Sequence, residues 1–437
     1  HKLIQNDHDI DVNVYGEFVD EMGKSLSLTG YGIDPRTPNT AAAITQGNAT
    51  NQLYAVVGGG KTENVIMGGL LNAKYAYKGK YSVTASLRND YSSKLPENNR
   101  SAFFWALGGI WDAGKEEFMK GVDFVDMLRV KASYGSSGNH NNFPGGDYPY
   151  QSTYGQGSYS GINTIEATYP GNPGLKWETT YTLNFGTDFE LFNRRLYGDV
   201  NYYSKTTKDL FVQKSLSAVA GFGIGAALAV NAGELSNKGF EWNINGEVLR
   251  MKDLVWTVFS TGGYNKNRVK SLGGVTSFEQ GTELVTVGLP LGSHYEVGWA
   301  GVDASTGAPL YYDANGQVTN VYSAEAAVQR WGTWEAPWKG GFGTSVNYKS
   351  FELSMLFSWQ RGATKVDNME YFLQNPVGFM SNGYNQSSDL KFWTQPGDVV
   401  STPSPLYPVN FSSKIIHDAS FMRLRDIKLT YVLPKCM

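Results

Sequence analysis

The sequence predicts an all-β fold, a transmembrane antiparallel β-barrel, and three observations support this prediction. Polar and apolar residues alternate over segments of roughly ten residues, the length that a tilted strand needs to cross a bilayer. The chain of 437 residues contains 51 Gly, 27 Tyr, 22 Phe and 11 Trp, a composition that suits pleated strands and tight turns. The connections between the alternating segments are either very short or very long.

The alternation recurs in about twelve segments along the chain. Each has one apolar face, expected to meet lipid, and one face rich in Asn, Thr, Ser, Glu and Arg, expected to line a water-filled lumen. In the segment 351–360, Leu356 is the one apolar residue on the polar face. The clearest segments are 10–18, 67–77, 81–88, 128–134, 180–186, 240–245, 351–360 and 427–433. On periodicity alone, a soluble β-sandwich remains the alternative, because its strands also alternate.

Aromatic residues tend to lie near the ends of these segments. Tyr and Trp rings prefer the level of the lipid headgroups, so girdles at both interfaces are expected. The residues concerned are Tyr75, Tyr77, Trp105, Trp111, Tyr134, Trp177, Tyr202, Tyr264 and Trp359.

The connections fall into two classes. Residues 77–81 and 349–350 read as tight turns, whereas 137–173, 271–338 and 362–413 read as long irregular loops. Short turns at one end of the strands and long loops at the other are typical of outer-membrane barrels. A compact soluble domain rarely has several loops of this length.

Composition and spacing exclude several classes of function. Lys and Arg total 37 and Asp and Glu 40, so the formal net charge of -3 offers no electrostatic basis for binding nucleic acid. The single cysteine, Cys436, permits neither an intrachain disulfide nor a structural zinc site. None of the histidines has metalloprotease spacing, and we find no G-x-S-x-G motif. We therefore expect no catalytic, cofactor or metal site and no enzyme activity, although a glycosidase carboxylate pair could meet only in three dimensions.

Three further segments resemble known motifs. Residues 55–62 approach a phosphate-binding loop, but the first Gly is replaced by Ala55 and a strand follows, so a Gly-rich loop is expected. Residues 313–316 (Asp-Ala-Asn-Gly) lack the further carboxylates of a calcium loop and predict a hairpin turn. The apolar segment 218–230 is either buried filler or a contact with a partner at the rim.

Several segments resemble the SusC/RagA-type TonB-dependent outer-membrane transporters. They include residues 84–93 (TASLRNDYSS), 128–139 (LRVKASYGSSGN), 172–179, 191–196, 199–210, 233–241, 299–303, 307–313 and 420–434. Each motif is moderately specific, and their order and spacing together are highly specific. The resemblance covers residues 65 to 434 and corresponds to the later part of the family's barrel.

This resemblance implies import of oligosaccharides or peptides across the bacterial outer membrane. In such transporters a SusD-like lipoprotein covers a plugged barrel, and TonB supplies energy through a region absent here. Residues 1–437 are then expected to form part of one outer-membrane β-barrel domain, without the plug and N-terminal regions. Because such a barrel has roughly 22 strands, segments 10–18 and 427–433 should not pair with each other. A soluble all-β protein that binds or cleaves carbohydrate, and a passive porin, are the alternatives.

Aromatic residues in the loop region 271–338 are candidate contacts of a substrate or of the lipoprotein, because aromatic side chains are enriched at binding surfaces. They could equally fold the loop onto itself. The candidates are Trp299, Tyr311, Tyr312, Trp331, Trp334 and Trp338.

Overall fold

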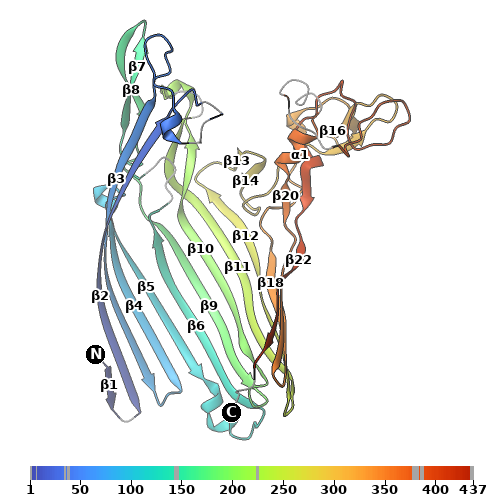
Figure 1. Cartoon of the computed structure of the whole chain (residues 1–437). Helices are drawn as coiled ribbons and strands as arrows, with labels where there is room; N and C mark the ends of the chain where they lie inside the picture. The colour runs from blue at the N-terminus through green and yellow to red at the C-terminus, as the bar shows by residue number, and fades with distance from the viewer. Residues whose placement is uncertain are drawn as a thin grey trace.

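The chain forms one large curved sheet that carries smaller folded loops at its upper end (Figure 1). A computed structural model describes residues 2–5, 7–33, 36, 40–141, 147–222, 226–375, 383 and 388–433. The sheet has 13 strands, and every neighbouring pair is antiparallel. In order, the strands are β1 (Lys2–Gln5), β2 (His8–Thr29), β3 (Val56–Tyr77), β4 (Tyr81–Ser92), β5 (Ser101–Asp112), β6 (Val125–Asn139), β9 (Glu178–Leu191), β10 (Leu196–Ser215), β11 (Ala227–Arg250), β12 (Leu254–Leu272), β18 (Trp338–Tyr348), β19 (Phe351–Arg361) and β22 (Phe421–Tyr431).

Tight turns join the strands at the lower end, as the sequence predicts. Lys78 and Gly79 both have positive φ, 53° and 61°, between β3 and β4, and Lys349 (φ 51°) occupies the turn between β18 and β19. Such left-handed residues let a short turn follow the twist of the paired strands. The strands that these turns join pair directly from the turn upward.

The long connections at the upper end contain regular structure, so the prediction of irregular loops was wrong in this respect. These pieces were missed because each is too short for a periodic pattern to be recognised. The additional strands are β7 (Thr153–Tyr159), β8 (Ile162–Tyr169), β13 (Ser277–Gln280), β14 (Glu283–Thr286), β15 (Trp299–Val302), β16 (Pro309–Tyr312), β17 (Val318–Thr319), β20 (Thr364–Val366) and β21 (Ile416–Asp418). The helices are α1 (Asn368–Leu373) and short 3-10 turns at Ala41–Ala43, Glu97–Asn99, Ala113–Lys115, Glu117–Met119, Ala218–Ala220, Ala324–Ala326 and Ser413–Ile415. No helix in the described part of the chain has the length and apolar character to span a membrane.

The apolar face of the sheet points away from the curve and is open to its surroundings. Leu183, Phe185 and Leu429 have exposed fractions of 43%, 55% and 71%, and Leu353 and Phe357 are half-buried by neighbours within the sheet. Among the described residues, the remaining sheets have only two or three strands and lie in the connections. The apolar face thus has no second large sheet packed on it, and the sandwich alternative fails.

Several aromatic residues gather on the outer face, at the upper ends of β18 and β19 and beside them in the middle of β11 and β12. Two of them lie over glycines: a Cβ on Gly262 would be 2.4 Å from the Trp242 ring, and one on Gly340 would be 3.0 Å from the Trp359 ring. Tyr264 and Trp359 thus join an aromatic group, as a girdle requires. We call this group the wall belt; its members are Phe240, Trp242, Tyr264, Trp338 and Trp359.

Trp177 departs from the interfacial position expected for it. It lies just before β9 but is only 6% exposed, and its ring meets Phe104 edge-on at 5.7 Å. Leu95, Leu175 and Ala229 complete this buried cluster. Phe104 is on the polar face of β5, so the cluster fills the upper mouth of the curve and anchors the connection between β6 and β9.

Two motif predictions also require correction. Residues 58–60, expected in a Gly-rich loop, lie within β3 and pair with residues 25–27 of β2. The segment 218–230 is divided: Val219 is 95% exposed on a short 3-10 turn, whereas Ala229 in β11 is 1% exposed. Neither of the two readings proposed for this segment holds for its whole length, and residues 223–225 lie outside the described part.

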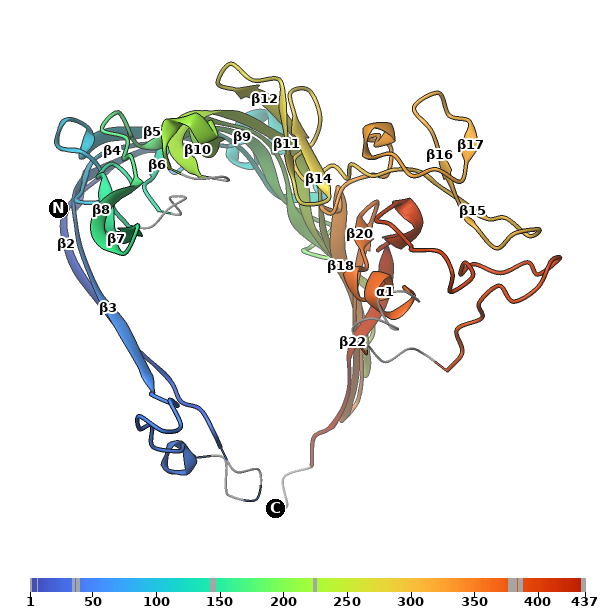
Figure 2. The same ribbon diagram turned by 90° about the horizontal axis from the view of Figure 1, so that it is seen from above.

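The sheet does not close on itself in the described part of the chain. Residues 10–18 pair with β3, and residues 427–431 pair with β19. The two segments do not pair with each other, as predicted, and Figure 2 shows the gap between the β2–β3 side and the β22 side of the curve. The sheet edges are β1, which covers only the start of β2, and β22.

Candidate functional site

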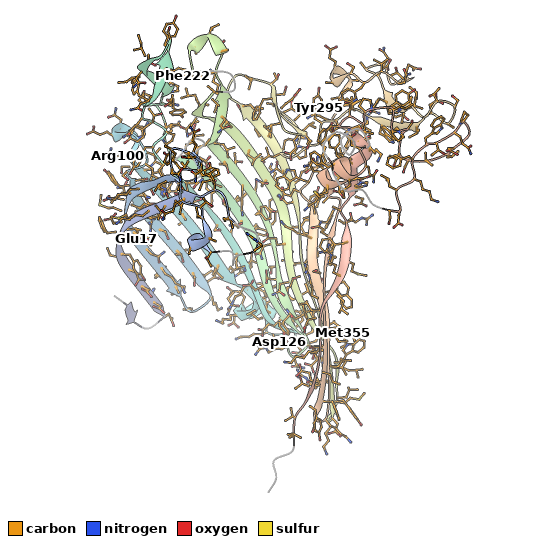
Figure 3. All side chains as sticks on the ribbon, turned by 45° about the horizontal axis from the view of Figure 1, so that its top comes forward. Glu17, Arg100, Asp126, Phe222, Tyr295 and Met355 are labelled. Atoms are coloured by element: carbon orange, nitrogen blue, oxygen red, sulfur yellow. The ribbon has the colours of Figure 1, made fainter. Side chains whose placement is uncertain are left out.

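The connections β12–β18 and β19–β22 fold together at the upper end of the wall. We call residues 273–337 and 362–420 the loop unit. Trp299 N donates to Ser413 Oγ (2.9 Å), and Trp393 Nε1 donates to Ala304 O (3.0 Å), so each half holds the other. The unit extends beyond the outer side of the curve (Figure 2), and Figure 3 places Tyr295 in it, at the end of the wall opposite Asp126.

Tyr311 is at the centre of the loop unit and is 1% exposed. Its ring meets Trp299 at 5.5 Å and Tyr322 at 5.2 Å, both edge-on, and its hydroxyl accepts a hydrogen bond from Asn410 N (3.3 Å). Burial raises the pKa of the Tyr311 hydroxyl. Trp299 and Tyr311 are two of the six candidate contacts. Both pack inside the loop unit and so fold the loop onto itself, instead of offering a surface to a substrate or to the lipoprotein.

A cavity of about 340 Å³ opens beside this centre and brings two other candidates together. Tyr312 and Trp331 line it on either side of Gly298, where a Cβ would come within 2.9 Å of the Tyr312 ring. Trp331 is held by a hydrogen bond from its Nε1 to Glu296 O (2.9 Å). The Arg330 guanidinium lies over the Trp331 ring at 5.9 Å. The complete lining is Gly298, Tyr312, Asp313, Ala314, Gly316, Ala326, Val328, Arg330 and Trp331.

The side chain of Asp313, which lines the cavity, stabilises a turn. Asp313 Oδ1 accepts hydrogen bonds from Asn315 N (2.9 Å) and Gln317 N (2.7 Å), and Gly316 has a φ of 76°. Residues 313–316 thus form the predicted hairpin turn, between β16 and β17. Among the described residues, no group of three or more His, Cys, Asp or Glu side chains could hold a metal ion.

Glu296 is a buried carboxylate next to the cavity. It is 8% exposed, and within the described structure its carboxylate has no hydrogen-bond donor. Burial raises the pKa of Glu296 to about 7, because an apolar environment disfavours the charged form. Neither Glu296 nor Arg330 could be identified from the sequence, since both depend on contacts between distant segments.

The last two candidates lie away from the cavity. Trp334 is 46% exposed and covers Gly292, whose φ is 79°. Trp338 begins β18 and belongs to the wall belt, with its ring 4.6 Å from Tyr264. Of the six residues, only Tyr312 and Trp331 share a concave surface.

The inner face of the wall is polar, and several of its charges are paired. Arg88 donates to Glu17 Oε2 on β2 (2.7 Å) and to Asp90 Oδ1 on β4 (2.7 Å). It reaches across β3 over Gly68, where a Cβ would lie 2.6 Å from its guanidinium. Lys131 on β6 pairs similarly with Asp188 on β9 (2.5 Å).

Two neighbouring recesses, of about 400 and 360 Å³, hollow the inner face where glycines replace larger side chains. They share Asn201 and Glu241. The side chains around them are mostly hydroxyls, amides and charges, among them Thr84, Lys131, Ser133, Asn184, Asp199, Asn243, Thr261 and Lys339. This surface can hydrogen-bond a hydrophilic molecule in many positions.

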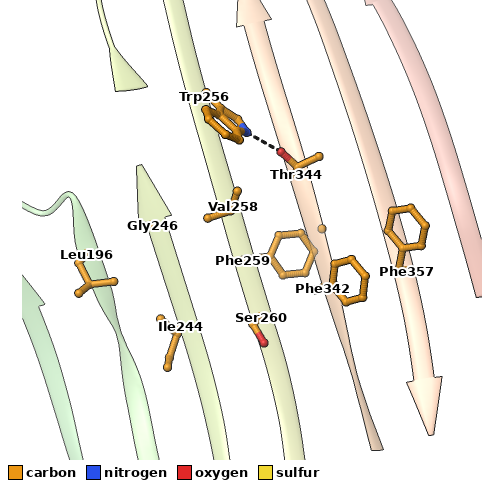
Figure 4. Close-up of a pocket in the computed structure, with 11 residues that line it drawn as sticks. Leu196, Ile244, Gly246, Trp256, Val258, Phe259, Ser260, Phe342, Thr344 and Phe357 are labelled. Carbon is orange, nitrogen blue, oxygen red and sulfur yellow. Dashed lines mark hydrogen bonds between the residues drawn. The ribbon is translucent and has the colours of Figure 1, made fainter. Parts of the chain in front are cut away.

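The opposite face carries an apolar hollow of about 430 Å³ across β10 to β19 (Figure 4). Phe342 and Phe357 stack there with ring centroids 4.9 Å apart, and Trp256 Nε1 donates to Thr344 Oγ1 (2.7 Å). Because its few polar groups are hydrogen-bonded within the sheet, this surface suits hydrocarbon rather than water.

Comparison with known proteins agrees with this two-faced wall. Residues 4–386 match the family model described as TonB dependent receptor-like, beta-barrel. The chain belongs to this family. Its members are outer-membrane proteins, so the apolar face meets lipid, and the long connections lie on the extracellular side.

Individual relatives narrow the subgroup. The chain is 28% identical to a TonB-dependent receptor of Formosa agariphila over 90% of this chain and 41% of the relative. It is 27% identical to TonB-dependent receptor SusC of Bacteroides thetaiotaomicron, over 85% of this chain and 38% of the relative. The structure of the RagAB peptide transporter matches with a TM-score of 0.86 and 27% identity, over 99% of this chain and 48% of that chain. This chain of the TonB-dependent receptor family is thus SusC- and RagA-like, and it spans about two fifths of the length of the curated relatives it matches.

Proposed function

We propose that the complete protein imports large hydrophilic nutrients, oligosaccharides or peptides, across the outer membrane. In this proposal TonB supplies the energy, and a SusD-like surface lipoprotein covers the extracellular opening. The observation that carries the proposal is the polar, recessed inner face on a wall whose outer face is apolar. The likeness to a peptide transporter over nearly the whole chain supports it.

The inner face supports import of a large hydrophilic cargo rather than of an apolar one. Hydroxyl and amide groups around Asn201 and Glu241 offer exchangeable hydrogen bonds, while two cations of this face, Arg88 and Lys131, are paired with carboxylates. These two cations are therefore not free to hold a cargo tightly.

The loop cavity supports recognition at the extracellular side. Tyr312 and Trp331 present ring faces on which a sugar or an aromatic side chain can stack, and Arg330 adds a donor beside them. The same surface could instead receive the lipoprotein. In either case the cavity, rather than the buried Tyr311, makes the contact.

Transport by cells that express the full-length protein tests this role. We expect Trp331→Ala to slow uptake of a labelled oligosaccharide or peptide mixture, or to weaken retention of the lipoprotein, by about tenfold, as loss of a central aromatic anchor does. Trp334→Ala is the matched control, because it removes an exposed indole from the same loop but not from the cavity. Equal uptake and equal lipoprotein retention by the two variants would show that the cavity is not the recognition site.

Two further measurements separate this function from its alternatives. Uptake that continues at full rate after deletion of TonB would indicate a passive porin. Incubation of the purified protein with the same oligosaccharides and peptides should leave them intact, since the matching family is one of transport receptors. Turnover that a single Asp or Glu substitution abolishes would instead establish a carbohydrate-cleaving or peptide-cleaving enzyme.

A further inference from the structure

The strands β2 and β3 continue above the rest of the sheet as a two-stranded ribbon. β3 pairs with β2 along its whole length, from Val56 to Tyr77, but with β4 only from Ile66 downward. Above Ile66, in the part of the chain that the structure describes, no strand lies on the other side of β3. The ribbon follows the rim of the curve at its extracellular end (Figures 1 and 2).

The register shows which backbone groups of β3 face this open side. Lys78 N donates to Asp7 O (2.7 Å), directly below the pair His8–Tyr77, so the even-numbered residues of β3 bond to β2. In an antiparallel ladder the alternate residues point their N–H and C=O groups to the opposite edge. Val57, Gly59 and Lys61 therefore aim their backbone groups away from β2.

Contacts lower on the same edge agree with this assignment. Val65 N donates to Ser93 Oγ (2.9 Å), and Ser93 N donates to Val65 O (3.0 Å). Next above, Glu63 O accepts a hydrogen bond from the hydroxyl of Tyr148. Beyond this point, within the described residues, Val57, Gly59 and Lys61 have no backbone partner on that side.

Most of the free stretch lacks the features that normally protect a strand edge. Residues 56–60 and their partners 25–29 contain no charge and no proline, and the pairing shows no bulge; Lys61 and its partner Lys24 are the first charges, at the lower end of the stretch. Natural edges usually carry one of these devices, because a bare row of N–H and C=O groups pairs with other chains. The three glycines at 58–60 weaken the strand and leave its edge without side chains, as occurs where another backbone approaches closely.

Closing the barrel would not cover this stretch. Further strands of a closed barrel would pair with the two sheet edges, which are the β1–β2 side and β22. The unpaired edge of the upper part of β3 is on the side opposite to β2, so it points away from the β1–β2 edge of the sheet. Closure of the barrel would therefore leave these backbone groups of β3 unpaired.

We propose that this edge of β3, from Val57 to Lys61, binds an extended peptide by adding it as a strand. The inference rests on the proposed function and deepens it, because main-chain pairing selects a peptide over an oligosaccharide as cargo. A polypeptide supplies N–H and C=O groups at the spacing of a strand, and a sugar chain does not. Since the hydrogen bonds are to the main chain, peptides of many sequences fit.

Binding of a defined probe to the full-length protein tests the proposal. The probe is a fluorescein-labelled decapeptide of alternating threonine and serine, compared with the same peptide N-methylated at every amide. Methylation at every amide removes the donors of both strand edges and leaves the side chains unchanged. We expect fluorescence anisotropy to show about tenfold weaker binding of the methylated peptide. Failure of the unmethylated peptide to bind, or equal binding of the two, would overturn the proposal.

A pair of double variants locates the site. Val57→Pro with Lys61→Pro removes two donors from the free edge but none from the ladder with β2, whereas Val57→Ala with Lys61→Ala keeps both. The proline pair should lose about tenfold in probe affinity and the alanine pair should keep it. Equal affinity of the two pairs would overturn the proposal, as would loss of the lipoprotein without loss of probe binding, which would assign the edge to that partner.

The two proposals fail differently. If the probe does not bind but cells still import nutrients in a TonB-dependent manner, the edge inference alone is wrong. If the probe binds and no nutrient is imported by any route, the transport function is wrong and the peptide edge stands.

Discussion

Aromatic side chains are held in place differently in the wall and in the loop unit. Trp242 in the wall lies over Gly262, on a surface open to lipid, and its indole Nε1 donates to Ser260 Oγ on the neighbouring strand (3.0 Å). Tyr311 in the loop unit is enclosed by residues that come from three separate segments. The first arrangement needs only one neighbouring strand, whereas the second needs the whole unit to be assembled.

This difference indicates that the stability of the wall depends on local contacts, whereas the stability of the loop unit depends on many contacts formed together. A side chain on the outer face of the wall is surrounded mostly by lipid. The free-energy cost of replacing it therefore depends on its depth in the bilayer. A side chain at the centre of the loop unit is surrounded by other side chains, so its truncation leaves a cavity.

The largest effect is expected from Tyr311→Ala. Truncation of a large, fully buried aromatic side chain should cost the loop unit about 3–5 kcal/mol of its local free energy of unfolding. Limited proteolysis of the intact protein should then cleave within residues 273–337, while the heat-modifiable mobility of the barrel on a gel stays unchanged. Tyr312→Ala is the control, because Tyr312 is 41% exposed. Unfolding of the wall together with the loop unit would show that the two regions are not independent.

A charge on the lipid face should have the next largest effect. Leu353 is directly opposite Val346 and Leu429 on the outer face, and Leu353→Arg should cost about 2–4 kcal/mol near the bilayer midplane. Unfolding by urea in lipid vesicles measures this loss. The matched control is Asn347→Arg, which lies next to Val346 but faces the lumen, opposite Glu352. Equal losses for the two substitutions would contradict the assignment of the faces.

A smaller effect, confined to the loop unit, is expected from the titration of Glu296. Its pKa of about 7 in the folded protein exceeds the ordinary value of 4.5, so folding strengthens proton binding. The resulting stabilisation is fully present below pH 4.5 and is lost as the pH rises to about 7; it amounts to no more than about 3 kcal/mol. Amide hydrogen exchange in the loop unit should therefore be faster at pH 8 than at pH 5, after correction for the intrinsic rate.

The substitution Glu296→Gln should remove this pH dependence and slow exchange at pH 8. Glu325→Gln serves as the control, because Glu325 is an exposed carboxylate of the same unit. Retention of the pH dependence in the Glu296 variant would assign it to another group.

The wall could be predicted from the sequence because its determinants are local. In β19, Leu353 and Phe357 face lipid and Ser354 and Ser358 face the lumen, so the pattern of one strand suffices to identify it. Leu356, the exception in that pattern, does face the lumen. The upper parts of β2 and β3 were not predicted, because the ribbon is exposed on both sides and has no reason to alternate.

The loop unit could not be predicted in the same way. Its cavity depends on Gly298, Tyr312 and Trp331 meeting, and its centre depends on a hydrogen bond between Tyr311 and Asn410, 99 residues away. Aromatic composition identified the region but did not separate Tyr311, which is structural, from Trp331, which lines the cavity. That distinction is set by tertiary contacts.

The position of Arg88 over Gly68 has a consequence for the proposed transport of a cargo along the inner face. A guanidinium extended into the channel would capture a passing carboxylate and slow it. Here the side chain lies flat across β3, with a carboxylate on each side, so it neither narrows the bore nor presents an unpaired charge. A side chain larger than hydrogen at position 68 would push the guanidinium away from the wall, and under the proposed transport function the displaced cation would slow acidic cargo.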